Sequence, residues 1–296
     1  MSVANIPGFV IGTAQLGMDY GVSNLSGKTT AIEAQELVNH AINKGFTWFD
    51  TAQSYGDSET VLGKSLINNA SKATIITKLH PDLDPKNSSE IFNSIQESCS
   101  RLSVSKLWGV MLHRSEWLQY WNDGLGAGLK KAKEEGLVEH IGVSVYDSEE
   151  AQEILSFPEI DIIQLPFNAW SPGFVESDFL ERARDAAILC FFRSVYLQGL
   201  LLMSKVDVIK QVPAAKQMIT VWHDLCKSFK TAPQILAFRY AKSFGFPLVL
   251  GIESVDQLKD NIVLSEQPNL NHDQISEIES VLHPLSSIEI INPSCW

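Results

Sequence analysis

The chain has 296 residues, of which 45% are hydrophobic and 20% are charged, a composition typical of a globular protein. Its 23 basic and 35 acidic residues give a formal net charge of -12, which argues against binding to nucleic acids or anionic membranes, because both recruit basic surfaces. We recognise no signal peptide and no apolar stretch near the roughly 20 residues that a transmembrane helix requires, so we expect a cytoplasmic protein.

Short apolar runs rich in β-branched and aromatic residues alternate with longer amphipathic segments along the chain. Helical periodicity is clearest at residues 29–45, 124–138, 176–187 and 255–265. In chain order, we expect strands at residues 9–13, 46–50, 73–78, 107–113, 139–145, 161–165, 188–195 and 247–251.

Most of the expected strands are apolar nearly throughout, which is typical of parallel strands that helices cover on both faces. Eight such units in fewer than 300 residues predict a (β/α)8 TIM barrel. No linker divides the chain, so we expect one domain over residues 1–296. A doubly wound open sheet is the alternative, but no GxGxxG motif follows the first strand, and the number of units favours a closed barrel.

Four cysteines, Cys99, Cys190, Cys226 and Cys295, lie far apart in the sequence. They form no CxxC pair and no Cys/His cluster with the spacing of zinc ligands. We therefore expect buried, reduced thiols and no metal site, with a disulfide or a metal as the alternative.

Polar side chains stand where several of the expected strands end. Asp50 ends the second strand, Lys78 the third and His113 the fourth, at separations of 28 and 35 residues, about one βα unit each. The βα loops of such a barrel meet at one face, where its active sites lie. We therefore expect these side chains to converge there, with Tyr55 on the loop that follows Asp50.

Each of these four residues alone has an ordinary structural explanation, as a cap, a solvated strand end or a packed side chain. Together, an acid, a base and a phenol in one cavity are suited to proton transfer near neutral pH. A Lys78 ammonium would lower the pKa of Tyr55, and Asp50 would help Lys78 to keep its proton. A neutral His113 could orient a carbonyl, so the set predicts proton delivery to an oxygen that gains negative charge.

The order of motifs resembles that of the aldo-keto reductase family over nearly the whole chain. The segment FDTAQSYGDSETVLGKSL, at residues 49–66, is similar to the most recognisable block of that family. TK at 77–78, MLHR at 111–114, GLVEHIGVSVYD at 136–147 and IIQLPFN at 162–168 follow in the same order as in the family. Several motifs in order are more specific than any one of them.

The resemblance implies that Asp50, Tyr55, Lys78 and His113 are the catalytic tetrad, with Tyr55 as the general acid/base. It also implies an NAD(P)H-dependent oxidoreductase that reduces a small-molecule aldehyde, ketone or sugar by hydride transfer, without a metal and without a Rossmann fold. The activity, the cofactor and the four roles are expectations from the family.

The nicotinamide end of the cofactor site departs from the family in two places. Val145 stands where an asparagine is usual, and Arg193 stands where an aromatic ring normally stacks on the nicotinamide. A planar guanidinium can stack in place of a ring, and the block FFRSVYLQGLL at residues 191–201 resembles a minority branch, unless a shifted register displaces Arg193. The implied residues at this end are Gly12, Thr13, Asp50, Ser144, Gln164, Arg193, Ser194, Leu197 and Gly199.

The segment VLGIESVDQLKDNI, at residues 249–262, resembles the adenosine end of the family's cofactor site. Where many members place Lys or Arg against the 2'-phosphate, this chain has Gly251 and Gln257, with Glu253 nearby, and a carboxylate favours a free ribose hydroxyl. A helix beginning near Val255 could still offer backbone donors to an anion. We expect NADP(H), the usual cofactor of the family, with NAD(H) as the alternative. The implied residues here are Gly251, Ser254, Gln257 and Asn261.

The substrate pocket is less defined by the sequence. Tyr20, His80, Arg114, Trp117 and Gln198 are expected to line or rim it, although each could equally be a surface-loop residue. Arginines near the mouth suit an anionic or sugar-like substrate, and tryptophans suit an apolar one. The short segment after the last helix favours small polar aldehydes, ketones or sugars.

Two functions of different class are consistent with these residues. The first is a working carbonyl reductase, which the complete tetrad favours. The second is a nicotinamide-nucleotide sensor on the same scaffold with vestigial catalysis, which the irregular nicotinamide site keeps open, since fold alone does not exclude it. The sequence does not indicate an oligomeric state.

Overall fold

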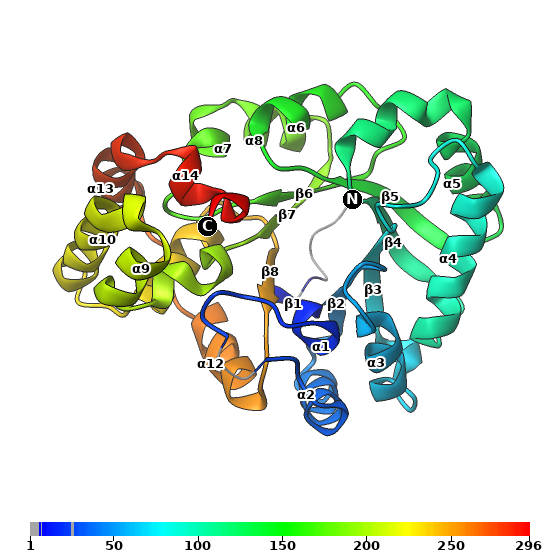
Figure 1. Ribbon diagram of the computed structural model, residues 1–296, viewed down its shortest axis with the longest axis horizontal. Coiled ribbons are helices and arrows are strands. Elements are labelled where there is room, and N and C mark those ends of the chain that lie inside the picture. The colour runs from blue at the N-terminus through cyan, green and yellow to red at the C-terminus, as the bar shows by residue number, and fades with distance from the viewer. Residues whose placement is uncertain (1–5, 7, 25–26) are drawn as a thin grey trace.

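The computed structural model describes residues 6, 8–24 and 27–296. Its centre is a closed barrel of eight parallel strands that neighbour one another in chain order, surrounded by helices (Figure 1). The barrel prediction is therefore confirmed, and the open-sheet alternative is wrong. The strands are β1 (Phe9–Gly12), β2 (Trp48–Asp50), β3 (Thr74–Lys78), β4 (Leu107–Leu112), β5 (Val138–Ser144), β6 (Ile162–Pro166), β7 (Leu189–Arg193) and β8 (Leu248–Gly251).

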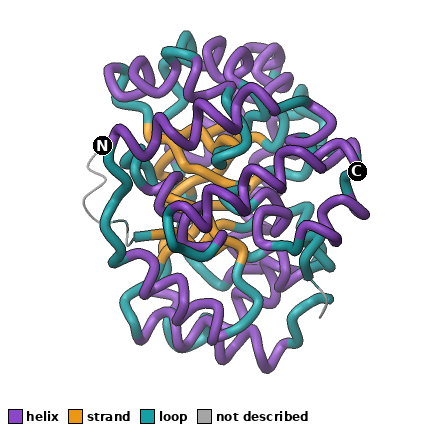
Figure 2. The backbone as a smooth tube through the Cα atoms, turned by 90° about the vertical axis from the view of Figure 1, so that its left-hand side faces the viewer, coloured by secondary structure: helices purple, strands orange, loops and turns teal. Residues whose placement is uncertain are grey.

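Helices form the outer layer of the molecule and enclose the strands, as Figure 2 shows from the side. The four segments predicted to be helical contain α2 (Ala31–Asn43), α5 (Leu125–Glu134), α8 (Phe179–Asp185) and α12 (Val255–Ser265). The other α-helices are α1 (Ala14–Gly17), α3 (Ser58–Ser65), α4 (Ser88–Leu102), α6 (Ser148–Ile154), α7 (Gly173–Glu176), α9 (Lys205–Gln211), α10 (Lys216–Ser228), α11 (Pro233–Lys242), α13 (His272–Leu282) and α14 (Ile288–Ile291).

Strand ends differ from their predicted positions by one or two residues, for local reasons. Strand β2 begins at Trp48 rather than Phe46, because Gly45 has a φ of 85° and the Phe46 amide donates to the carbonyl of Ala41, so Phe46 still belongs to the end of α2. Strand β7 ends at Arg193, because Ser194 has a left-handed φ of 58° and leaves the ladder.

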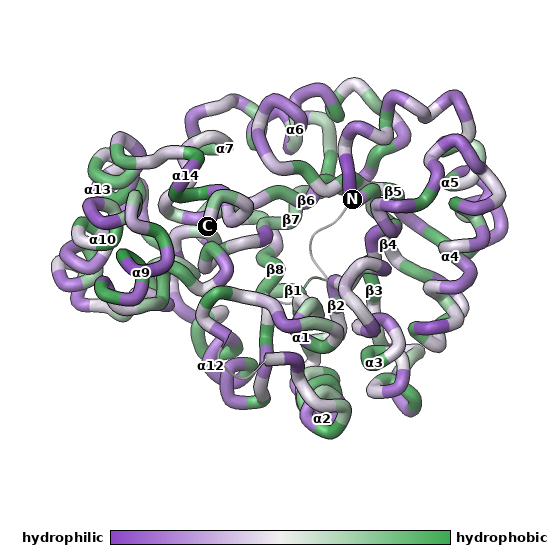
Figure 3. The backbone as a smooth tube through the Cα atoms, viewed as in Figure 1, coloured by the Kyte–Doolittle hydropathy of each residue, from purple (hydrophilic) through white to green (hydrophobic). Residues whose placement is uncertain are grey.

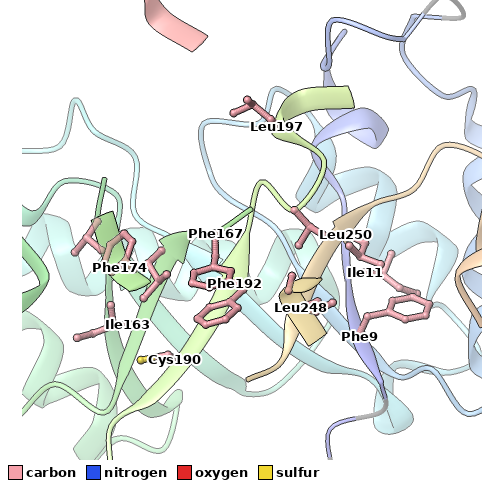
Figure 4. Close-up of a cluster of buried hydrophobic side chains, with 14 of the residues drawn as sticks. Phe9, Ile11, Ile163, Phe167, Phe174, Cys190, Phe192, Leu197, Leu248 and Leu250 are labelled. Carbon is pink, nitrogen blue, oxygen red and sulfur yellow. The ribbon is translucent and has the colours of Figure 1, made fainter. Parts of the chain in front are cut away.

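The larger hydrophobic core lies between the barrel and the outer helices. Apolar residues accordingly run along the strands, whereas hydrophilic stretches lie on the outer helices (Figure 3). Part of this core is the stack of Phe167 on Phe192, whose ring centroids are 4.1 Å apart (Figure 4). The core fixes the positions of the strand ends, since Phe167 follows β6 and Phe192 lies one residue before the end of β7.

The barrel interior follows from the two-residue period of the strands. Ile76 and Met111 belong to a small cluster inside the barrel, whereas Ile75 and Val110 belong to the outer core. At the carboxyl end of each strand, two residues beyond the level of this inner cluster, the next inward-facing position holds a polar residue or glycine. These positions hold Gly12, Asp50, Lys78, His113, Ser144, Gln164, Arg193 and Gly251, all of them predicted site residues.

Two further expectations can be compared with the structure. Among the described residues, no helix is both long enough and apolar enough to cross a bilayer. Cys99, Cys190 and Cys226 are buried, but Cys295 is exposed. The expectation of burial is wrong for Cys295 because it lies in a short helical turn, Pro293–Cys295, beside the end of the chain.

Candidate active site

A cavity of about 290 Å³ opens at the carboxyl ends of β1, β2, β6, β7 and β8. We call it the barrel-end cavity. The residues predicted from the sequence that line this cavity are Gly12, Thr13, Tyr20, Asp50, Tyr55, Gln164, Arg193, Ser194, Gln198, Gly199, Gly251, Gln257 and Asn261. Polar wall residues that the sequence analysis did not single out include Gln15, Ser23, Tyr196, Gln234 and Asp260.

Asp50 and Lys78 form a buried ion pair between the neighbouring strands β2 and β3. Lys78 is 1% exposed, and its Nζ donates to both carboxylate oxygens of Asp50, at 2.8 and 2.7 Å, and to the carbonyl oxygen of Thr51 at 3.2 Å. Gln164 Nε2 donates across the barrel to Asp50 Oδ1 at 2.8 Å. Burial lowers the pKa of Lys78, and Asp50 opposes that change, as the sequence suggested.

The loop after β2 carries Tyr55 and packs closely against α1. A Cβ atom on Gly17 would lie 1.8 Å from the carbonyl oxygen of Tyr55, so only glycine permits this approach. Ser58 Oγ donates to the carbonyl oxygen of Thr13 at 2.7 Å and so ties the start of α3 to the end of β1. These contacts fix the backbone of Tyr55 at the edge of the barrel-end cavity.

The buried carboxylate of Glu59 joins α3, which follows the Tyr55 loop, to β3 and α4. Glu59 is 3% exposed and accepts hydrogen bonds from Thr77 Oγ1 at 2.6 Å and from Arg101 Nε at 2.7 Å. Gln53 Oε1 accepts from the backbone amide of His80 at 2.7 Å. The sequence analysis missed this network because its partners lie 18 to 42 residues apart and carry no local pattern.

The charge balance at Tyr55 differs from the sequence-based hypothesis. Burial and then Asp50 raise the pKa of Tyr55 above its ordinary value, and the cation that opposes this is Arg193. Lys78 Nζ lies 5.2 Å from the centroid of the Tyr55 ring, with all three of its donors directed to Asp50 and Thr51. The expected lowering of the Tyr55 pKa by Lys78 is therefore wrong, because Asp50 neutralises that charge.

His113 follows β4 and stands beside the phenol. Its ring meets the Tyr55 ring edge to face, with centroids 5.9 Å apart, and its Nδ1 lies 3.1 Å from Ser54 Oγ. Burial and the charge of Lys78 lower the pKa of His113 to about 3, so the imidazole is neutral at ordinary pH, as expected. Because Ser54 engages Nδ1, Nε2 remains for another partner.

Two buried amides on the cavity wall carry unsatisfied acceptors. Gln164 Oε1 has no hydrogen-bond partner in the described structure, although Gln164 is completely buried. Gln15 Oε1, on the β8 side of the cavity near Gly251, also has no hydrogen-bond partner in the described structure. Buried carbonyl oxygens are normally bonded, so the wall is prepared for a ligand with N–H or O–H donors. Ser144 is buried beside Gln164, its pairing partner on the neighbouring strand.

Arg193 occupies the inward position at the end of β7, where Pro166 is its partner on β6. Its Nη2 donates to the carbonyl oxygen of Val145 at 2.9 Å, and its guanidinium carbon lies 4.8 Å from the centroid of the Tyr146 ring. A register shift that removes Arg193 from the cavity, the alternative left open by the sequence, is therefore wrong. The Val145 side chain is buried in the outer core and offers no amide to the cavity.

The loop that follows β7 is held in an unusual backbone conformation. Ser194, Leu197, Gln198 and Gly199 have φ values of 58°, 48°, 54° and 95°. Such clusters of left-handed residues persist only where their surroundings enforce them, and they concentrate at binding sites. Leu197 anchors the loop through its side chain, which is buried in the outer core rather than exposed to the cavity (Figure 4).

The far end of the cavity lies between β8 and α12. Ser254 is the N-cap of α12 and accepts from the Gln257 amide at 3.2 Å, so its side chain serves the helix rather than the cavity. Glu253 and Asp260 both lie on the cavity wall here. Of all the described residues that line the cavity, Arg193 alone carries a basic side chain. Because the Asp50 carboxylate on this wall is paired with Lys78, the unpaired charge of the cavity is positive near Tyr55 and negative near α12.

The predicted substrate residues fall into different environments. Tyr20 and Gln198 line the cavity. His80 is half-buried, and Arg114 is exposed; neither lies on the cavity wall. Trp117 is only 6% exposed and packs into the outer core, which corrects the expectation that it lines the pocket. Its position shortly after β4 did not distinguish a pocket residue from a core residue.

Comparison with known proteins agrees with this architecture. Residues 9–283 match the model of the aldo/keto reductase family. The chain is similar to probable aldo-keto reductase 1 of Glycine max, with 28% identity over 162 residues, which are 51% of this chain and 46% of that protein. It is also similar to D-arabinose 1-dehydrogenase of Saccharomyces cerevisiae, with 27% identity over 154 residues, 49% of this chain and 44% of that protein.

These two matches span only about half the length of either relative. A solved structure extends the likeness of the fold to nearly the whole chain. The aldo-keto reductase AKR11C1 from Bacillus halodurans superposes with a TM-score of 0.75 at 17% identity, over 97% of this chain and 95% of that one.

The buried ion pair predicts a large loss of stability when one partner is removed. Lys78→Met leaves the Asp50 carboxylate buried without its cation, so we expect the free energy of unfolding to fall by about 3–5 kcal/mol. Adding Asp50→Asn should recover part of the loss. Denaturant unfolding would measure both variants. As a control, Lys259→Met removes a lysine from an exposed pair with Asp256 and should cost less than about 1 kcal/mol. Equal losses in the two single variants would contradict this account.

The lowered pKa of His113 predicts a particular pH dependence of stability. Between pH about 6.5 and about 3, His113 of the unfolded chain takes up a proton that the folded chain refuses, so the free energy of unfolding falls as the pH falls through this window. His113→Asn, which does not titrate, should flatten the dependence. Unfolding of both proteins at a series of pH values measures the difference, and identical slopes would show that His113 titrates normally.

Proposed function

The chain belongs to the aldo/keto reductase family, and we propose that it is an oxidoreductase that reduces the carbonyl of an aldehyde, a ketone or a sugar to an alcohol. One arrangement carries the proposal. Tyr55 lies on the wall of the barrel-end cavity with His113 against its ring, and the Asp50–Lys78 pair is buried beside it. A proton donor and unsatisfied acceptors thus line one cavity, and a neutral hydrogen-bonding ring packs against the donor.

Tyr55 is the proposed proton donor. Its raised pKa keeps the phenol protonated at neutral pH, and an alkoxide formed from a carbonyl is a stronger base than a phenolate, so the proton passes from Tyr55 to that oxygen. The phenolate left behind is then stabilised by the positive charge of Arg193. The charge of Arg193 therefore contributes most during the reaction, when negative charge develops on Tyr55.

His113 is the proposed orienting residue. Because its pKa is about 3, it approaches the substrate as a neutral ring. If Ser54 Oγ donates to Nδ1, then Nε2 carries the hydrogen and can donate to the carbonyl oxygen. Asp50 and Lys78 act through position and charge, since both are buried and bonded to each other.

A nicotinamide cofactor fits the chemistry of the wall. Gln164 Oε1 is a buried, unpaired acceptor that suits the N–H group of a carboxamide, and Gln164 itself is oriented by its bond to Asp50. Gln15 offers a second such acceptor near Gly251. When bound, the reduced cofactor supplies the hydride for the carbonyl carbon.

We further propose that NAD(H) is preferred over NADP(H), although NADP(H) is the usual cofactor of the family. The α12 end of the cavity has Glu253 and Asp260 on its wall. A 2'-phosphate would add negative charge beside these carboxylates, and the described wall at that end offers it no lysine or arginine. The net charge of -12 also works against a more anionic ligand.

The proton-donor role predicts that Tyr55→Phe lowers the rate of carbonyl reduction by about 10²–10⁴-fold, because the ring remains and only the acid is lost. Cofactor affinity, followed by quenching of tryptophan fluorescence, should not change. Turnover of the variant near the original rate would refute the assignment. Tight cofactor binding by the unmodified protein without turnover of any aldehyde, ketone or sugar would favour a nucleotide sensor instead.

The charge of Glu253 predicts the cofactor preference. The unmodified protein should bind NADH more tightly than NADPH, and Glu253→Lys should shift the ratio of the two dissociation constants toward NADPH by about tenfold or more, because it replaces a repulsive charge with a charge-assisted donor. Glu266→Lys makes the same charge change at the far end of α12 and should leave the ratio unchanged. Tighter binding of NADPH by the unmodified protein would overturn the preference.

A further inference from the structure

The guanidinium of Arg193 is the most unusual charge in the barrel-end cavity. It is half-buried, and no carboxylate of the described residues lies within ion-pair distance of it. Arg101 and Arg182 have carboxylate partners. The other described arginines without one, Arg114, Arg184 and Arg239, do not line the cavity. In a chain with 35 acidic and 23 basic residues, a cation without a partner at the wall of a cavity needs an explanation.

Protein contacts satisfy only part of this guanidinium. Nη2 donates to the carbonyl oxygen of Val145 at 2.9 Å, and Nη1 lies 3.4 Å from Ser194 Oγ. A guanidinium has five N–H donors in a planar fork, so three remain for water or a ligand. A carboxylate matches two of them at once, in the geometry that arginine binds best.

The position of Arg193 is fixed in advance of binding. It is the last residue of β7 and pairs with Pro166, so its backbone belongs to the barrel. The ring of Tyr146 packs on the guanidinium at 4.8 Å, and Tyr146 is 61% exposed, so this stack forms part of the rim. A side chain ordered in this way loses little entropy when an anion arrives.

Arg193 also lies close to the place of reaction. Its positive charge opposes the rise in the pKa of both Tyr20 and Tyr55, and it contributes to the lowered pKa of His113. Arg193, Tyr20 and Tyr55 also line the same cavity, the barrel-end cavity. An anion on Arg193 would therefore be a near neighbour of a carbonyl group held between Tyr55 and His113.

We propose that Arg193 binds a carboxylate carried by the substrate, so that the preferred substrates are short oxo-carboxylates, with the carbonyl at Tyr55 and the carboxylate on the guanidinium. This inference rests on the proposed carbonyl-reductase function. It assigns to Arg193 a role in substrate selection. The Tyr20 hydroxyl, on the same cavity wall, is a second available donor for the anion.

Matched pairs of substrates test the proposal. Glyoxylate, 4-oxobutanoate and 5-oxopentanoate are compared with their methyl esters, which keep the carbonyl and remove the charge. For the best acid, kcat/KM should exceed that of its ester by about tenfold or more. Arg193→Met should abolish this preference, mainly through KM, and Arg193→Lys should retain part of it, because the charge remains and the planar fork is lost.

Two controls separate the possible causes. Arg182→Met removes the same charge from an exposed helix, where Arg182 pairs with Asp178, and should leave the acid-to-ester ratio unchanged. Dissociation constants of NADH for the unmodified protein and for Arg193→Met, from tryptophan fluorescence, show whether the anion on Arg193 is instead a phosphate of the cofactor. A loss of cofactor affinity with an unchanged acid-to-ester ratio would overturn the proposal.

Binding without turnover distinguishes failure of this inference from failure of the proposed function. Calorimetric titration with 4-oxobutanoate, in the presence of NAD+, should show binding to the unmodified protein and at least tenfold weaker binding to Arg193→Met. If neither acids nor esters are reduced but this Arg193-dependent binding is present, the anion site stands and the reductase function fails. Equal kcat/KM for acids and esters, or carboxylate binding that does not depend on Arg193, overturns the anion site itself.

Discussion

The buried pair of Asp50 and Lys78 is the interaction on which the arrangement of the candidate site depends. Two opposite charges removed from water hold each other in place, and each satisfies the other's hydrogen-bonding groups. Gln164 reaches the same carboxylate from the opposite side of the barrel. One carboxylate therefore sets the orientation of a lysine, an amide and, through the loop that follows it, the phenol of Tyr55.

The fold and the inner end of the site could be predicted because both depend on local periodicity. The alternation of strands and helices identified the barrel, and the two-residue period of a strand decides which residue at its carboxyl end points inward. Asp50 and Lys78 each lie two residues beyond an apolar residue of the barrel interior, namely Trp48 and Ile76. Gln164 follows Ile162 in the same way. Family resemblance and strand geometry select the same positions for this reason.

The rest of the site depends on contacts between distant segments, which no local pattern carries. In the sequence, Glu59 resembles an ordinary exposed helix residue. In the structure it is buried against Thr77 of β3 and Arg101 of α4. Trp117 is a loop aromatic in the sequence and a core residue in the structure. The charges around Tyr55 also depend on distant segments. Lys78 is neutralised by Asp50, so the cation that acts on the pKa of Tyr55 is Arg193, at the end of β7.

A single residue, Arg193, changes the distribution of charge in this cavity. An aromatic ring at the position of Arg193 would leave the cavity with acidic groups and no cation beyond the buried Lys78. With Arg193 in place, positive charge gathers at the Tyr55 end while Glu253 and Asp260 keep the α12 end negative. A ligand with its negative charge near the reacting carbonyl is attracted by this gradient, and a ligand with extra charge at the far end is repelled. Selection of the substrate and selection of the cofactor then follow from one distribution of charge along one cavity.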